Sequence, residues 1–403
     1  MNVEEFTAEA RAFLDAHATR KPDHADEFRW GEGDDFVGIV EEGDPETEAA
    51  AVAAAREWAA TRFDAGFGWI DGPIALGGGG LGGEHVRAYR ALESRYELPD
   101  LSIFTIGLGM VAPTIAAHAR PDTAQRYLAP LHRGDLIACQ LFSEPGAGSD
   151  LAALSTRAER DGDDWVVNGQ KVWTSNAHHA GIGEIICRTD PDAPKHAGMT
   201  AFLVDMSAPG VEVRPLRQMT GGAGFNEVFF TDVRIPDDHR LGEVGGGWAV
   251  AITTLMNERA SIGSGMGLGR GPGPFERLIA LTREMGRDGD PIARNRLAGL
   301  YAQQQALAWT AKRALAALQA GRLPGAELSI LKLGGTLHLI GIADYAAGVL
   351  GPRLCADVGE WGTFAWNKLV CGAPGARLGG GTDEILRNII GERVLGLPRE
   401  PKG

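Results

Sequence analysis

Cysteine is scarce in this sequence: four occur among 403 residues, namely Cys139, Cys187, Cys355 and Cys371. They are widely spaced and no two form a CxxC pair. A disulfide framework and a zinc site of the usual spacing are therefore not expected. Scattered thiols of this kind are typical of a reducing compartment, and we predict a cytoplasmic protein.

The chain also lacks an excess of positive charge. Lysine and arginine number 39 against 53 aspartates and glutamates, which gives a net charge of -14. Nucleic acid and anionic membrane surfaces both require a basic face, so neither is predicted as a partner. An anionic ligand would have to be held by local hydrogen-bond donors against the general field.

Targeting and membrane signals are missing from the sequence as well. The first residues, MNVEEFTAEARAFLDAH, are acidic and amphipathic, unlike a signal or transit peptide. The most apolar run, Leu333–Leu350, contains His338 and Asp344. We predict a buried core helix there and no membrane span. No internal repeat is found, and no G-x-G-x-x-G lies between a strand and a helix, which disfavours a Rossmann domain.

Hydrophobic periodicity divides the chain into three parts. Helices are predicted over 4–17, 49–62 and 85–96, with a surface loop over 23–48. The middle third predicts short strands over 184–188, 200–204, 211–215 and 227–233, preceded by a hairpin whose turn is Asn168-Gly169 between 165–167 and 170–174. Helices return over 297–318, 328–350 and 383–395. We predict an α+β fold with an N-terminal helical domain (1–135), a middle antiparallel β domain (136–243) and a C-terminal helical bundle (244–403).

Three segments carry the strongest functional signal. CQLFSEPGAGSDLAALST, at Cys139–Thr156, combines glycines with small hydroxyls, which lets backbone N–H groups approach an anion closely. NGQKVWTSN follows at Asn168–Asn176, and GGGTDEILRNIIGERVLGLPRE begins at Gly379. Together they resemble the acyl-CoA dehydrogenase family of flavoproteins, since SEPGAGSD and GTDEI…R…ER look like its two signature regions. The likeness runs over most of the chain and implies the same order of helices, β domain and helices.

The resemblance implies FAD as the cofactor. By this resemblance, Gln140, Phe142 and Ser143 would lie along the flavin ring, and Gly148 and Ser149 would meet the pyrophosphate. Trp173 would cover one flavin face, and Ser175 would lie near flavin N5. Thr382 and Glu384 of the C-terminal motif would also contact the cofactor. Each also has a structural interpretation: serine and glycine build turns, a strand tryptophan is usually core, and Thr382 could N-cap a helix that starts near Asp383.

The catalytic base is the second implication of the resemblance. Many family members carry a glutamate immediately before Gly-Thr, where this chain has Gly380. A minority place the glutamate on an earlier helix, followed by arginine, which matches Glu258 and Arg259. We therefore expect Glu258 to remove the α-proton of the substrate, Arg259 to order the substrate site, and the Gly380 N–H, with a flavin ribityl hydroxyl, to bond the thioester oxygen. The structural alternative for Glu258 is a surface acid paired with a neighbouring arginine.

Other polar residues are assigned structural roles. Glu144 and Asp150 are read as acceptors that fix the loop. His178 and His179 have no metal-ligand spacing with other histidines, cysteines or acids, so we predict solvent-facing or hydrogen-bonded histidines and no metal site.

Two departures from the family pattern concern its assembly. The Arg-x-x-Phe-Gly run that reaches a neighbouring subunit's FAD is replaced by TREMGRDGD at Thr282–Asp290, and a later Gln-x-x-Gly-Gly-x-Gly run by DYAAGVLGP.

The expected function is FAD-dependent oxidation of an acyl-CoA to the trans-2-enoyl-CoA in lipid metabolism. An electron-transfer flavoprotein would take the electrons, and the assembly would be a homo-tetramer or a hetero-tetramer with a related chain. The alternatives are a partner subunit that completes another chain's flavin site, and a flavin oxidase or monooxygenase on the same fold.

Overall fold

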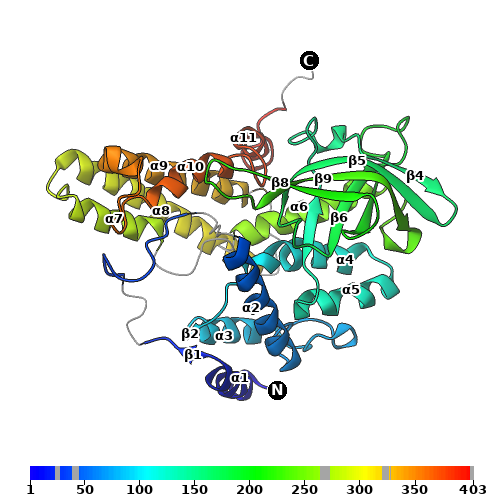
Figure 1. Ribbon diagram of the computed structural model, residues 1–403, viewed down its shortest axis with the longest axis horizontal. Helices are drawn as coiled ribbons and strands as arrows, with labels where there is room; N and C mark the ends of the chain where they lie inside the picture. The colour runs from blue at the N-terminus through cyan, green and yellow to red at the C-terminus, as the bar shows by residue number, and fades with distance from the viewer. Residues whose placement is uncertain (23–27, 39–44, 264–272, 320–325, 327, 400–403) are drawn as a thin grey trace. The chain divides into compact units, whose positions relative to one another are not determined.

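The computed structural model describes residues 1–22, 28–38, 45–263, 273–319, 326 and 328–399 (Figure 1). It divides into two compact units. The first comprises Met1–Asp23, Glu42–Arg217 and Gly222–Glu258, and the second His24–Glu41, Gln218–Gly221 and Arg259–Gly403. Helices, a central sheet and further helices follow one another along the chain, as the α+β class predicts. The predicted domain boundaries after residues 135 and 243 stay predictions.

The first unit begins with short helices whose ends follow from local sequence. Asn2 and Glu5 form a reciprocal capping box at the start of α1, and Phe6, Ala10 and Leu14 bury one stripe of this helix. The helices are α1 (Val3–His17), α2 (Pro45–Asp64), α3 (Gly83–Glu93), α4 (Ala112–His118) and α5 (Pro121–Arg133). Two predicted bounds were wrong: α2 begins before residue 49, and the helix predicted to Tyr96 ends at Glu93. Tyr96 lies instead in β2 (Tyr96–Glu97), paired with β1 (Thr19–Arg20).

An eight-stranded sheet forms the centre of the first unit. Its strands are β3 (Ala138–Leu141), β4 (Arg157–Asp161), β5 (Asp164–Ser175), β6 (Ile182–Arg188), β7 (Met199–Asp205), β8 (Val211–Leu216), β9 (Phe225–Pro236) and β10 (Arg240–Leu241). Most neighbours are antiparallel, as predicted for this domain, but β3 and one residue pair of β4 run parallel to β6, so the sheet is mixed. β3 follows α5 directly, and the loop, β4 and β5 separate β3 from β6 along the chain. This long connection allows β3 and β6 to pair in the same direction.

Both faces of β6 and β7 are buried, and apolar residues occur on both faces of each strand. On one face, Ile182, Ile186 and Leu203 pack with residues of α4 and α5. Figure 1 shows these two helices along one side of the sheet. On the other face, alternate residues such as Ile185 and Phe202 pack with the inward side chains of β5 and β9.

The predicted hairpin at Asn168-Gly169 was wrong. β5 runs unbroken from Asp164 to Ser175, and the tight turn precedes it, at Gly162 between β4 and β5. At Asn168 the pairing with β9 shifts register, and the Asn168 amide donates to Asp232 across the strands (3.0 Å). Asparagine and glycine suit a bulge as well as a turn, because both tolerate unusual backbone angles.

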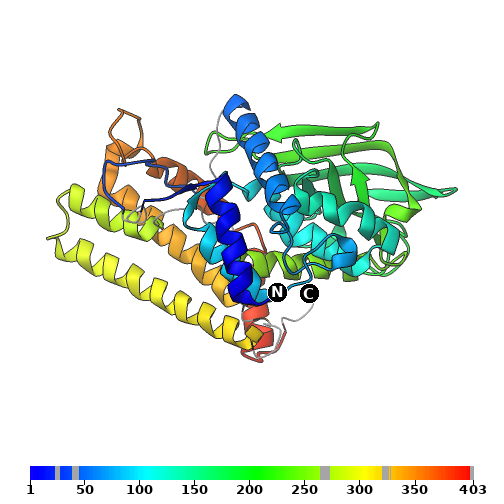
Figure 2. The same ribbon diagram turned by 90° about the horizontal axis from the view of Figure 1, so that it is seen from below.

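The second unit is a helical bundle. It contains the remainder of α6 (Gly247–Gly263), in which the unit boundary falls, and α7 (Pro274–Glu284), α8 (Pro291–Gln319), α9 (Leu328–Leu350), α10 (Trp366–Ala376) and α11 (Asp383–Ile389). Figure 2 shows α8 and α9 side by side. The predicted last helix, 383–395, is split: α11 ends at Ile389 and continues as a π-helical turn, Ile390–Val394.

The apolar helix α9 packs in the core of this unit. Ile342, Ala346 and Leu350 contact the same cluster as Leu278 and Trp366. By length and composition alone, Leu328–Leu354 is the described helix that could cross a membrane. Such a signal is weak, since the core helix of a soluble protein passes the same test.

Candidate active site

The loop after β3 is anchored to β5 by a buried ion pair. The Lys171 ammonium lies 2.8 Å from a Glu144 oxygen, and the side chains of both residues are almost fully buried. The same ammonium donates to the Phe142 carbonyl (3.1 Å), and the Val172 N–H donates to the Ser143 carbonyl (2.9 Å). The start of the loop is thereby fixed to β5, immediately before Trp173.

Glu144 closes the other end of this loop. Its carboxylate accepts from the N–H and hydroxyl of Ser155 and from the N–H of Thr156, at 2.7–3.0 Å. Burial alone would raise the pKa of Glu144, but the Lys171 charge and these donors outweigh it and lower the pKa to about 2. Glu144 is thus an ionised loop-fixing acceptor, as its sequence position suggested. Asp150 differs, because its carboxylate is exposed and pairs with Lys195 on the surface instead of with the loop.

Trp173 lies on a bulge and points out of the sheet. The pairing of β5 with β9 shifts register between Lys171 and Thr174, and Trp173 adopts a left-handed φ of 60°. This conformation is rare for a bulky side chain and typically marks a functional site. The indole is 60% exposed, with Phe225 of β9 edge-on to it at 6.2 Å between ring centroids. The core interpretation of a strand tryptophan therefore does not apply here. Ser175, half-buried, ends the same strand.

Gln140 of β3 lies beside a buried acid that the sequence analysis did not identify. In the parallel pairing of β3 and β6, Gln140 lies opposite Glu184. Burial raises the pKa of Glu184 to about 8, and a hydrogen bond from Thr254 only partly opposes this shift. Glu184 is therefore protonated at neutral pH. The Thr254 hydroxyl donates to it at 2.6 Å and contacts the Thr114 hydroxyl at 2.9 Å.

This network fixes the helix that carries Glu258. Thr254 precedes Glu258 by one turn of α6, so the Glu184 hydrogen bond anchors that helix to the sheet strand beside Gln140. Glu258 itself is half-buried and has an interaction partner. Arg259 belongs to α6, but its side chain lies outside the described part of the structure.

The C-terminal motif lies in the second unit. Gly380 and Gly381 both have left-handed backbones, with φ of 66° and 93°, which a glutamate at the usual family position would adopt only with strain. Thr382 N-caps α11 through the Ile385 N–H (3.3 Å), as the structural alternative predicted. Glu384 is exposed, 4.0 Å from Arg387. The buried Lys332 ammonium donates to the Gly381 carbonyl (2.8 Å) and steadies this loop.

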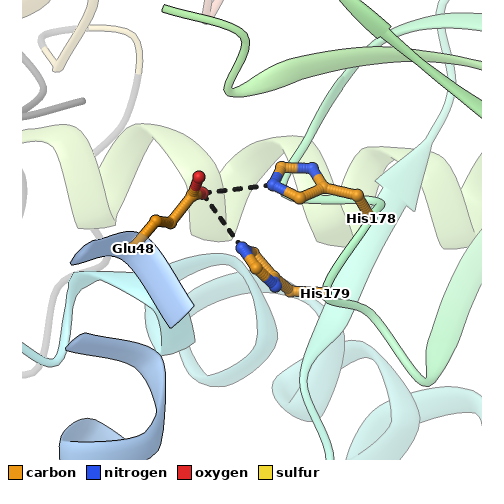
Figure 3. Close-up of side chains that lie close together, drawn as sticks. All are labelled: Glu48, His178 and His179. Carbon is orange, nitrogen blue, oxygen red and sulfur yellow. Dashed lines mark hydrogen bonds and ion pairs between the residues drawn. The ribbon is translucent and has the colours of Figure 1, made fainter. Parts of the chain in front are cut away.

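His178 and His179 are hydrogen-bonded, which is one of the two arrangements predicted for them. The loop after β5 brings both Nε2 atoms to one oxygen of Glu48 on α2, at 3.1 Å and 2.9 Å (Figure 3). Burial works to raise the pKa of Glu48, but the two histidine hydrogen bonds lower it below its ordinary value. Sequence alone could not find this cluster, because Glu48 is about 130 residues away.

The residues present fit FAD. An exposed indole suits a planar ring, and Phe142 and Ser143 are fixed beside its strand. A Cβ added to Gly148 would meet no described heavy atom within 4 Å, so this exposed backbone is open to a pyrophosphate. Lys171, Glu184 and Asn226 are supporting residues that the sequence did not identify. For these three residues the sequence offered one signal, Lys171 in NGQKVW, a lysine at an inward-facing position of the strand.

Comparison with known proteins gives two matches to one family. The acyl-CoA dehydrogenase middle domain matches residues 139–233, and the acyl-CoA dehydrogenase C-terminal domain matches residues 245–395.

Individual proteins agree. Acyl-CoA dehydrogenase IpdE1 of Mycobacterium tuberculosis is 35% identical over 411 residues, covering 100% of both chains. Acyl-CoA dehydrogenase FadE34 of the same organism is 42% identical over 309 residues, which are 76% of this chain and 41% of that relative. Among solved structures, the Tcur3481-Tcur3483 steroid ACAD has a TM-score of 0.76 at 28% identity, covering 99% of this chain and 98% of the other.

Proposed function

This chain belongs to the acyl-CoA dehydrogenase family and is an FAD-dependent oxidoreductase acting on acyl-CoA, and from that premise we propose that Glu258 is its catalytic base. The observation that carries the proposal is the pair of positions: glycine at 380, where a glutamate would be strained, and a glutamate at 258 on an anchored helix.

The proposed reaction removes two hydrogens from adjacent carbons of the acyl group. The Glu258 carboxylate takes the α-proton, and the C–H electron pair forms the Cα=Cβ double bond of the trans-2-enoyl-CoA. FAD, when bound, would supply the two-electron acceptor for the hydride that leaves the β carbon. In this proposal the Gly380 N–H would donate to the thioester oxygen while negative charge develops there, and Trp173 would cover one face of the flavin ring. The electrons then pass to an electron-transfer flavoprotein.

We infer an acyl group attached to a bulky ring system. The support is the likeness to a solved steroid ACAD over 99% of this chain. We further propose a cytoplasmic enzyme, since cysteine usage is that of a reducing compartment.

The test replaces Glu258 with glutamine. With a panel of straight-chain and steroid-linked acyl-CoA thioesters and a dye acceptor, we expect E258Q to retain FAD and lose kcat by about 10²–10⁴-fold, the usual contribution of a positioned base. The matched control is E243Q, whose side chain is 94% exposed just before α6 and whose kcat should stay unchanged. Wild-type turnover in E258Q would reject Glu258 as the base. Peroxide formation without the dye would instead favour a flavin oxidase.

A further inference from the structure

We propose that Asn226 is a positioning residue for Trp173, and that it ties the bulge displaying this indole to α2 through His178 and Glu48. The inference rests on the proposed function in one respect, namely that Trp173 covers bound FAD.

The bulge needs a restraint, because its backbone is not one that the sequence adopts freely. Trp173 and Asn176 both have left-handed φ values, 60° and 57°, although neither is glycine. Such conformations persist only where the surroundings fix them.

Asn226 supplies that restraint from the neighbouring strand. It is fully buried and lies opposite Thr174 in the β5–β9 pairing. Its amide nitrogen donates to the Thr174 carbonyl at 3.0 Å, and the Gly224 carbonyl lies 3.4 Å away. The hydrogen bond therefore holds the residue that directly follows Trp173, while the adjacent Phe225 contacts the indole ring.

The same amide fixes the ring tautomer of His178. Its nitrogen lies 3.1 Å from His178 Nδ1. A carboxamide nitrogen can only donate, so Nδ1 must accept. Turning the amide over would point its oxygen at two carbonyls, which rules out the reverse assignment.

A neutral imidazole that accepts at Nδ1 carries its proton on Nε2. That Nε2 faces Glu48 at 3.1 Å and therefore donates to it. Glu48, His178 and His179 have side chains of the types that bind metals, and their ligand atoms lie within 4.8 Å of one another. A metal would need a bare Nε2 on His178, which Asn226 disfavours. The cluster in Figure 3 is thus a hydrogen-bonded clasp between α2 and the segment after β5.

The experiment titrates FAD into apoprotein and follows flavin fluorescence. Loss of the buried amide in N226A frees the Thr174 carbonyl and lets the bulge relax, so we expect FAD to bind about tenfold more weakly. The matched control is N168A. Asn168 joins the same two strands at their other register shift, away from Trp173, and its loss should change the dissociation constant less than twofold.

A second background separates positioning from general destabilisation. If Asn226 acts through the indole, N226A should change FAD affinity less than twofold in a W173L chain. A full tenfold loss in that background, or wild-type affinity of N226A alone, would overturn the proposal.

His178 provides a milder variant in case N226A does not fold. H178F keeps an aromatic ring but removes the acceptor and the donor, and should weaken FAD binding about threefold, again only when Trp173 is present. Unchanged affinity would remove the clasp from the proposal. These readouts are independent of turnover. A wild type that binds FAD without oxidising acyl-CoA would refute the proposed function and leave this inference standing.

Discussion

Two buried acids in the first unit have opposite protonation, and their partners explain the difference. Glu144 lies against the Lys171 ammonium and several N–H donors, so it stays ionised. Glu184 receives one hydroxyl hydrogen bond, and its second oxygen finds no partner among the described residues. Without a compensating charge, burial favours the neutral acid. A buried carboxyl can therefore serve as a charge or as a neutral hydrogen-bonding group.

Glu184 should make stability depend on pH. Its folded pKa, about 8, lies above the ordinary value of 4.5, so between these values the folded state holds a proton that the unfolded state has lost. Stability from this group is complete below the unfolded pKa and declines as the pH rises toward 8. We expect E184Q to lack this decline. As the pH rises, the unfolding free energy of E184Q should increase relative to that of wild type by up to about 1.4 kcal/mol per pH unit.

Chemical denaturation at pH 5, 6, 7 and 8, chosen to span roughly the titration of one carboxyl, measures this difference. The exposed E243Q variant should keep the wild-type profile. Parallel profiles for E184Q and wild type would show that Glu184 is ionised in the folded protein.

At the scale of elements, helix ends and bulges decide which side chains reach the site. α5 ends at Gly134, whose left-handed φ of 86° turns the chain toward β3 and the loop after it. The same glycine packs closely: a Cβ there would lie 2.8 Å from the Ala59 Cβ and 3.1 Å from a Phe104 ring carbon. The join between α5 and the sheet therefore depends on glycine for two separate reasons.

G134A should destabilise the first unit by about 2–4 kcal/mol, because backbone strain and overpacking add. The matched variant is G162A in the β4–β5 turn. Its φ is 64°, and a Cβ would meet no described heavy atom within 4 Å, so only the strain remains, about 1 kcal/mol. Thermal and denaturant unfolding give both values. Equal losses would show that contact with Ala59 and Phe104 contributes nothing.

At the scale of the whole molecule, two sequence runs bear on how the FAD site is completed. The resemblance predicted an Arg run and a Gln run that reach a neighbouring subunit's FAD, and this chain has TREMGRDGD and DYAAGVLGP in their places. Assembly with a related chain, one of the two assemblies expected from the sequence, stays a prediction. A hetero-tetramer would supply those contacts from the second chain.

We expect the chain purified alone to be yellow, since FAD is its cofactor, and we expect a hetero-tetramer with a related chain to bind FAD more tightly. Absorbance near the flavin bands and molar mass from light scattering measure both. A colourless chain that gains no flavin on titration would favour the partner-subunit alternative.

Local patterns predicted much of the first and last thirds. The apolar stripes and the cap at Thr382 depend on residues three or four apart, so they can be predicted from short segments. The hairpin prediction failed because Asn-Gly suits a turn and a bulge equally, and only pairing with β9 distinguishes them.

From the sequence by itself, the resemblance of three segments predicted the family and its FAD cofactor, and hydrophobic periodicity predicted the α+β class, because both signals are local. Tertiary structure decided that Lys171 neutralises Glu144, that Glu184 stays protonated, and that Glu48 meets His178. Each of these depends on burial and on partners many residues away, and the energy of a charge or hydrogen bond is set by those surroundings and not by the residue alone.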